Sequence, residues 1–123
     1  MVECLLIESN CAERQRLAGL LTELGLACAQ REKADEGLLY CNERLPEVVM
    51  MEASAQPSTL DFLNKLNLRR RTSSQPIIIL YADRPDVDAV VQSIFEGAAE
   101  FLTSPFDRDL LKFKLQQAGV LEN

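Results

Sequence analysis

Several side chains that can bind a ligand or a cation directly follow short apolar runs of the sequence. Glu52 ends the run Val48–Met51, and Glu8 and Ser9 follow the run Val2–Ile7. An acid at the carboxyl end of a central parallel strand points into the crevice where open α/β sheets hold their ligands. Two such carboxylates can chelate a cation together with a backbone carbonyl and waters. The alternative interpretation is that Glu52 is only the first solvated residue after a buried strand.

The elements that must position these acids alternate along the chain. A short apolar run with β-branched residues is typical of a buried strand, and leucines at helical spacing are typical of a helix. These patterns predict five strands, each followed by a helix. The predicted strands are Val2–Ile7, Leu26–Gln30, Val48–Met51, Pro76–Leu80 and Glu100–Thr103. The predicted helices are one capped by Ser9 or Asn10 and ending at Gly25, then Lys33–Glu43, Leu60–Leu68, Pro85–Glu96, and Arg108–Ala118 capped by Asp107.

Repeated alternation of strand and helix predicts one fold class. Such chains form a parallel sheet with helices on both faces, joined by right-handed crossovers. We therefore expect an α/β fold with a doubly wound, five-stranded parallel sheet in three layers. The chain contains no linker, repeat or low-complexity segment, so residues 1–123 are expected to form a single domain.

Four of the predicted helices carry apolar residues at the spacing of a packed face, and in the first of them these are Leu17, Leu20, Leu21 and Leu24. Leu38, Cys41 and Leu45 are expected to face inward from the second helix, and Leu63 and Leu66 from the third. The strongest apolar spacing lies in the fourth helix, in the set Val87, Val90, Val91, Ile94 and Phe95.

Composition excludes several classes of function. The 123 residues are 47% apolar and 26% charged, which suits one globular domain. A formal net charge of -6 argues against nucleic acid or an anionic membrane as the main partner. The chain has no histidine, which excludes histidine-based catalysis and histidine–metal sites. No apolar run approaches the length of about 18 residues that a membrane span needs.

The four cysteines, Cys4, Cys11, Cys28 and Cys41, are scattered and form no Cys-x-x-Cys pair. They are expected to be reduced, largely buried thiols of a cytoplasmic protein, because a metal or redox site needs closer spacing. The first residues lack a basic segment and run directly into a predicted strand. No signal peptide is therefore expected.

The segment around the last predicted strand carries a specific motif. Gly97–Phe106 reads Gly-Ala-Ala-Glu-Phe-Leu-Thr-Ser-Pro-Phe. It resembles the Gly-Ala-x-x-Tyr/Phe-Leu-x-Lys-Pro-Phe pattern of the receiver domains of bacterial two-component response regulators. Leu6–Asn10, Pro46–Glu52 and Pro76–Ala82 carry the resemblance over the rest of the chain. It implies the chemotaxis-regulator-like, flavodoxin-like fold and a role in signal transduction.

The chain departs from this family at the residues that carry its chemistry. Family receivers hold Mg²⁺ with two adjacent acids, phosphorylate an Asp, and place a Thr or Ser and a Lys nearby. The matching positions here are Glu8 and Ser9, Glu52, Tyr81 and Ser104. A phosphoryl group among acids needs a cation and a lysine to neutralise its charge, and the longer Glu side chain moves the attacking oxygen out of line. We therefore expect a degenerate phosphoacceptor pocket without Mg²⁺ or catalytic residues, with Tyr81 filling the vacated space.

The resemblance implies a non-enzymatic signalling module, a pseudo-receiver that binds proteins without being phosphorylated. A sensor kinase or a downstream effector is the expected partner, and a homodimer is a further candidate. The family docks partners through the fourth helix, fifth strand and fifth helix. The residues expected on this face are Asp86, Ala89, Gln92, Ser93 and Glu96, with Lys112 and Gln116 nearby. Phe101 matches the family's switch aromatic, and the alternative interpretation is a core aromatic on a short strand.

Two other functions stay open at the level of sequence. The retained acids Glu8 and Glu52 favour a working phosphoreceiver that accepts a phosphoryl group from a histidine kinase. The cluster Arg69, Arg70 and Arg71 favours a nucleotide-sensing module, because arginine clusters bind phosphates bidentately. Its alternative interpretation is the solvated start of a loop.

Overall fold

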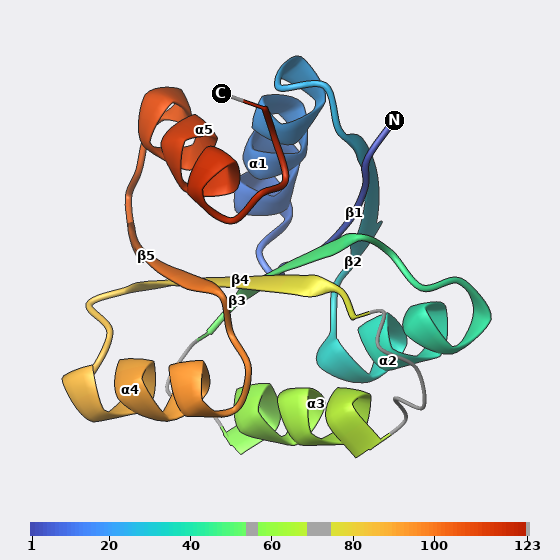
Figure 1. The fold of residues 1–123 in the computed structure, drawn as a ribbon, viewed down its shortest axis with the longest axis vertical. Coiled ribbons are helices and arrows are strands. Elements are labelled where there is room, and N and C mark those ends of the chain that lie inside the picture. Colours follow the sequence, from blue (N-terminus) through green and yellow to red (C-terminus); the bar gives the residue numbers. More distant parts are fainter. Residues whose placement is uncertain (54–56, 69–74, 123) are drawn as a thin grey trace.

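The computed structural model describes residues 1–53, 57–68 and 75–122, apart from the side chains of residues 57, 58, 67 and 68. Within these residues five strands alternate with five helices (Figure 1). The strands are β1 Glu3–Ile7, β2 Ala27–Arg31, β3 Val48–Glu52, β4 Ile77–Asp83 and β5 Glu100–Ser104, and the helices are α1 Cys11–Glu23, α2 Ala34–Glu43, α3 Pro57–Leu68, α4 Val87–Phe95 and α5 Arg108–Gln117.

All five strands are parallel and form one sheet in the order β2-β1-β3-β4-β5. Helices α1 and α5 cover one face of this sheet, and α2, α3 and α4 cover the other (Figure 1). This arrangement confirms the predicted doubly wound α/β fold. Because β3 lies between β1 and β4, its run Val48–Met51 is buried on both faces.

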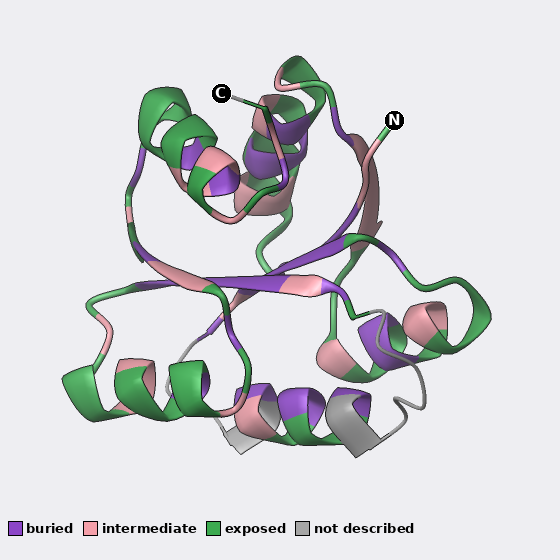
Figure 2. Ribbon diagram, in the orientation of Figure 1, coloured by how far each residue is buried: buried purple, intermediate pink, exposed green. Residues whose placement is uncertain are grey.

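Two apolar layers hold the helices to the sheet (Figure 2). Successive strand residues point to opposite faces, so alternate residues of each strand join different layers. Met50 and Ile79 pack with Leu111 of α5, whereas Val49 and Ile78 pack on the side of α3. The same alternation decides which strand-end residues face the α1 and α5 side of the crevice.

Several predicted details of the helices are confirmed. Asn10 caps α1 by accepting a hydrogen bond from the Glu13 backbone at 2.9 Å, and Asp107 caps α5 in the same way. Leu38, Leu63 and Leu66 are buried, and Cys41 is half-buried. The inward position predicted for Leu45 is wrong, because α2 ends at Glu43 and the chain continues extended, leaving Leu45 45% exposed.

Helix α4 packs on the sheet with the side opposite to its apolar stripe. Val87, Val91, Ile94 and Phe95 are exposed, and Val90 is half-buried. Ser93 instead faces inward, and its hydroxyl donates a 2.8 Å hydrogen bond to the Ala89 carbonyl. The spacing of the stripe predicts a packed face, and that prediction is wrong for its four exposed members. Small side chains occupy the side of α4 that meets the sheet, so helical geometry turns the stripe outward.

The described part of the chain has no helix that is long and apolar enough to cross a bilayer.

Candidate functional site: the crevice at the strand ends

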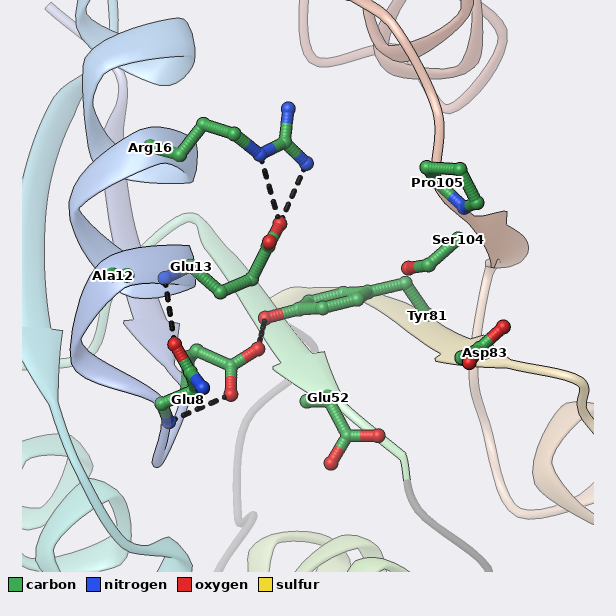
Figure 3. A pocket seen from close by; sticks show the side chains of 10 residues that line it. Glu8, Ala12, Glu13, Arg16, Glu52, Tyr81, Asp83, Ser104 and Pro105 are labelled. Carbon is green, nitrogen blue, oxygen red and sulfur yellow. Dashed lines mark hydrogen bonds and ion pairs between the residues drawn. The ribbon is translucent and has the colours of Figure 1, made fainter.

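The carboxyl ends of β1, β3, β4 and β5 surround a cavity of about 550 Å³ (Figure 3). Four of the five residues predicted for the pocket line it, namely Glu8, Glu52, Tyr81 and Ser104. The fifth, Ser9, is exposed and lies outside the lining. The other lining residues are Asn10, Ala12, Glu13, Arg16, Asp83 and Pro105.

The register of the sheet explains why these side chains meet. Glu52 pairs with Tyr81, and Asp83 pairs with Ser104 in the neighbouring strand. Paired residues in parallel strands share a face, as do residues two apart in one strand. Asp83 therefore reaches the cavity from the same side as Tyr81. The sequence prediction missed Asp83, although its spacing from Tyr81 was the signal that places it there.

The side chains of Tyr81 and Glu8 form a hydrogen bond with each other inside the crevice. The Tyr81 hydroxyl donates a 2.8 Å hydrogen bond to Glu8 Oε1, and the Asn10 backbone donates a 3.0 Å bond to Glu8 Oε2. Only 1% of Tyr81 and 5% of Glu8 is exposed. The Tyr81 side chain thus reaches from β4 across to the end of β1 (Figure 3). Both oxygens of the buried carboxylate have a donor from the chain itself.

The ring of Tyr81 is fixed by a second set of contacts. It packs edge to face on Phe106, with the ring centroids 5.8 Å apart. The guanidinium of Arg16 lies 5.9 Å from the Phe106 centroid and forms an ion pair with Glu13 at 2.6 Å. Burial raises the pKa of the Tyr81 hydroxyl, and its hydrogen bond to Glu8 raises it further. The hydroxyl therefore stays protonated at neutral pH and acts as a donor.

The remaining cavity lining is acidic. Glu52 and Ser104 are half-buried and Asp83 is exposed, and Glu8 and Glu13 add two further carboxylates. Within the described residues, no three Cys, Asp or Glu side chains are grouped so that they could hold one metal ion.

Phe101 and the residues predicted for the docking face lie outside the cavity lining. Phe101 is half-buried against the core layer on the side of α2 and α3. Ser93 is only 4% exposed, so its predicted place on the exposed face is wrong, since it packs against the sheet. Of the other residues predicted for that face, Asp86, Gln92 and Lys112 are exposed, and Ala89, Glu96 and Gln116 are half-buried. The cluster Arg69, Arg70 and Arg71 lies outside the described residues.

None of the four cysteines forms a disulfide. Cys4 is buried and Cys28 and Cys41 are half-buried, but Cys11 is exposed because it is the first residue of α1. The prediction of largely buried thiols is therefore wrong for Cys11. Burial raises the pKa of the Cys28 thiol to about 11.

Known proteins of one kind resemble this chain in sequence. The transcriptional regulatory protein FixJ of Azorhizobium caulinodans is 31% identical over 111 residues, covering 82% of this chain and 47% of FixJ. The transcriptional regulatory protein AfsQ1 of Streptomyces coelicolor is 28% identical, covering 94% of this chain and 50% of AfsQ1. No family model matches the sequence.

Solved structures agree with these relatives. A response regulator receiver domain protein from Clostridium thermocellum superposes with a TM-score of 0.83 at 22% identity, covering 96% of this chain and 94% of its own. The receiver domain of NtrX from Brucella abortus gives a TM-score of 0.82 at 22% identity, covering 94% of this chain and 96% of its own. The chain is a response-regulator receiver domain. It spans about half, or less, of the length of the curated relatives that it matches.

Proposed function

We propose that this receiver domain is an interaction module of two-component signalling that binds its partner without accepting a phosphoryl group. The hydrogen bond between Tyr81 and Glu8 carries this proposal. In this proposal the module acts in the cytoplasm, has no enzymatic activity, and binds a sensor kinase or a downstream effector. A homodimer through α4, β5 and α5 stays a prediction.

The hydrogen bond competes directly with a bound cation. A cation at Glu8 Oε1 would have to displace the Tyr81 hydroxyl, which is buried and would then lose its acceptor. Leaving a buried polar group unpaired costs about 1–3 kcal/mol. The ring itself also occupies part of the crevice, where it packs against Phe106. These contacts favour a crevice that is stable without Mg²⁺.

The charge of the cavity also opposes phosphorylation. Four carboxylates line it, from Glu8, Glu13, Glu52 and Asp83, against one guanidinium. That guanidinium, of Arg16, is already paired with Glu13. A phosphoryl group would add roughly two negative charges. Ser104, at the position of the family's lysine, supplies no positive charge to offset them.

Intact-mass analysis after treatment with acetyl phosphate and Mg²⁺ tests the proposal. We expect no stable mass increase of one phosphate in the native chain. The Glu52→Gln variant, treated in parallel, measures labelling at other sites. An increase in the native chain that is absent from Glu52→Gln would overturn the proposal.

The second candidate function is a working phosphoreceiver, which the presence of both Glu8 and Glu52 in the cavity favours. Replacing Glu52→Asp alone should not produce labelling, because Ser9 and Ser104 remain and still supply neither a metal-binding acid nor a positive charge. Combining Ser9→Asp, Glu52→Asp, Tyr81→Thr and Ser104→Lys should restore it in part. Strong labelling of the single variant would instead favour the phosphoreceiver.

A thermal-shift panel of nucleotides tests the third candidate, a nucleotide sensor using Arg69–Arg71.

A further inference from the structure

Helix α4 exposes large apolar side chains to solvent along its whole length. Phe95 is 83% exposed and Val87 is 74% exposed, and Val91 and Ile94 expose nearly half of their surface. We call these four residues the α4 stripe. They recur at positions i, i+4, i+7 and i+8, so they lie on one side of the helix, away from the buried Ser93. Within the described fold, the α4 stripe packs against neither core layer.

We propose that α4 is a recognition helix whose stripe inserts into an apolar groove, rimmed by basic residues, on a different protein. This inference rests on the proposed function of the chain as an interaction module, and it names the chemistry of the partner. It also moves the contact from the polar residues predicted for α4 to the apolar residues beside them.

The size and spacing of the α4 stripe suit insertion into an apolar groove. Four side chains with these exposures present roughly 400 Å² of apolar surface, which is within the size of the largest apolar patch on a typical monomer, and such patches are often functional. Anchors at i, i+4 and i+7 are the pattern by which an amphipathic helix occupies a hydrophobic groove. Phe95 is the aromatic residue of the stripe and its most exposed member, and we expect it to be the main anchor because aromatic residues dominate binding hot spots.

The charge around the stripe defines the rim of the groove. Between Pro85 and Gly97 the chain has three acids and no base. Asp86 and Asp88 are exposed at the start of α4, and Glu96 at its end accepts a hydrogen bond from Gln92. Opposite charges across an interface steer association and fix its register. A groove with Lys or Arg at its rim complements this helix, whereas an anionic membrane does not.

The area of the stripe argues against a second copy of this chain held by the two α4 stripes alone. Two stripes packed on one another would bury roughly 800 Å², less than the about 1,200 Å² at which specific interfaces begin. Such a pair would also bring the acids of α4 against a helix that carries no base. A concave partner covers more of the same helix and supplies the opposite charge.

Site-specific photo-cross-linking in extracts of the native host tests the inference. One variant of the 123-residue chain carries p-benzoylphenylalanine in place of Val91, and a control carries it in place of Asn64, which is exposed on α3 on the same side of the sheet. We expect position 91, and not position 64, to cross-link to one foreign protein. The cross-linked segment should be apolar with Lys or Arg beside it.

Binding to the protein identified in this way then measures both parts of the proposal. Phe95→Ser and the charge reversal Asp88→Lys should each weaken binding by about tenfold or more, while the control Asn64→Lys leaves it unchanged. Cross-links from position 91 to a second copy, to lipid, or to an acidic or polar segment would overturn the inference. Equal cross-linking at both positions, none at position 91, or full affinity of Asp88→Lys would do the same.

The design separates this inference from the function on which it rests. A third probe replaces Lys112, which is exposed on α5. Cross-links from position 112 alone, without a phosphoryl donor, would overturn the α4 inference and leave the interaction module intact. Cross-links that appear only with acetyl phosphate and Mg²⁺ would overturn the proposed function itself.

Discussion

The crevice at the strand ends and the outer face of α4 differ in which side chains they bury and which they expose. In the crevice, the buried polar groups of Tyr81 and Glu8 are paired with each other. On α4, large apolar groups such as Phe95 stand in solvent while the small polar Ser93 is buried. The crevice lies where α/β sheets bind ligands, yet its groups are satisfied from within. The helix lies at the edge of the fold, yet its groups have no partner in either core layer.

The two regions should therefore contribute differently to the stability of the fold and to the recognition of a partner. A satisfied crevice contributes to the stability of the fold, whereas an exposed apolar stripe contributes little to it and is available for recognition. Substitutions in the two regions should therefore differ in which measurement they change. Variants of the crevice should lower the free energy of unfolding, and variants of the stripe should not.

The largest effect is expected from Tyr81→Ala. The change removes a fully buried aromatic ring, its edge-to-face contact with Phe106 and the hydrogen bond to Glu8. Deleting a buried aromatic side chain costs about 3–5 kcal/mol of unfolding free energy. Urea denaturation measures this value. A loss below about 1 kcal/mol would mean that the ring does not fill the crevice in solution.

Removing only the hydroxyl, in Tyr81→Phe, isolates the hydrogen bond. We expect a loss of about 1–3 kcal/mol, because Glu8 Oε1 keeps its burial but loses its donor. The same change at the half-buried Tyr40 is the matched control and should shift stability by less than about 0.5 kcal/mol. Equal losses of unfolding free energy at the two tyrosines would show that the hydrogen bond between Tyr81 and Glu8 does not stabilise the crevice.

Much of the fold and part of the crevice could be predicted from the sequence. The apolar run before Glu52 predicts a buried central strand, and β3 occupies the centre of the sheet. The positions of Glu8, Glu52 and Tyr81 directly after predicted strands also predict that these residues share a crevice. The hydrogen bond between Tyr81 and Glu8 could not be predicted, because it joins residues 73 apart and depends on the strand order and on side-chain direction. Glu13 and Arg16 were missed because they reach the cavity from α1 and not from a strand end.

The orientation of α4 could not be predicted for a different physical reason. Periodicity shows that a helix has an apolar side, but it does not show which side meets the sheet. In α1 the side with Leu17 and Leu21 is buried, as its spacing predicts. In α4 the comparable side faces solvent and Ser93 meets the sheet. An apolar stripe at the edge of a fold is therefore as consistent with recognition as with packing.

Enlarging the buried side of α4 should be harmful. Ser93→Leu places a longer side chain where only a small one faces the sheet, and overpacking of this kind costs about 1–3 kcal/mol. Gln92→Leu, at the exposed neighbouring position, is the control and should leave stability nearly unchanged. Thermal or urea unfolding distinguishes the two. A stabilised Ser93→Leu variant would show that α4 can rotate and bury larger residues.

The smallest effect on stability is expected from Phe95→Ser, on the exposed stripe. The Phe95 ring is 83% exposed, so most of its surface already contacts water in the folded state. Surface substitutions of this kind change the unfolding free energy by less than about 0.5 kcal/mol. Leu111→Ala, in the fully buried core of α5, is the positive control and should cost about 2–5 kcal/mol. Denaturation of both variants in the same buffer gives the contrast. If Phe95→Ser destabilises the domain as strongly as Leu111→Ala does, then Phe95 is covered in solution by the domain itself, and the stripe is part of the core.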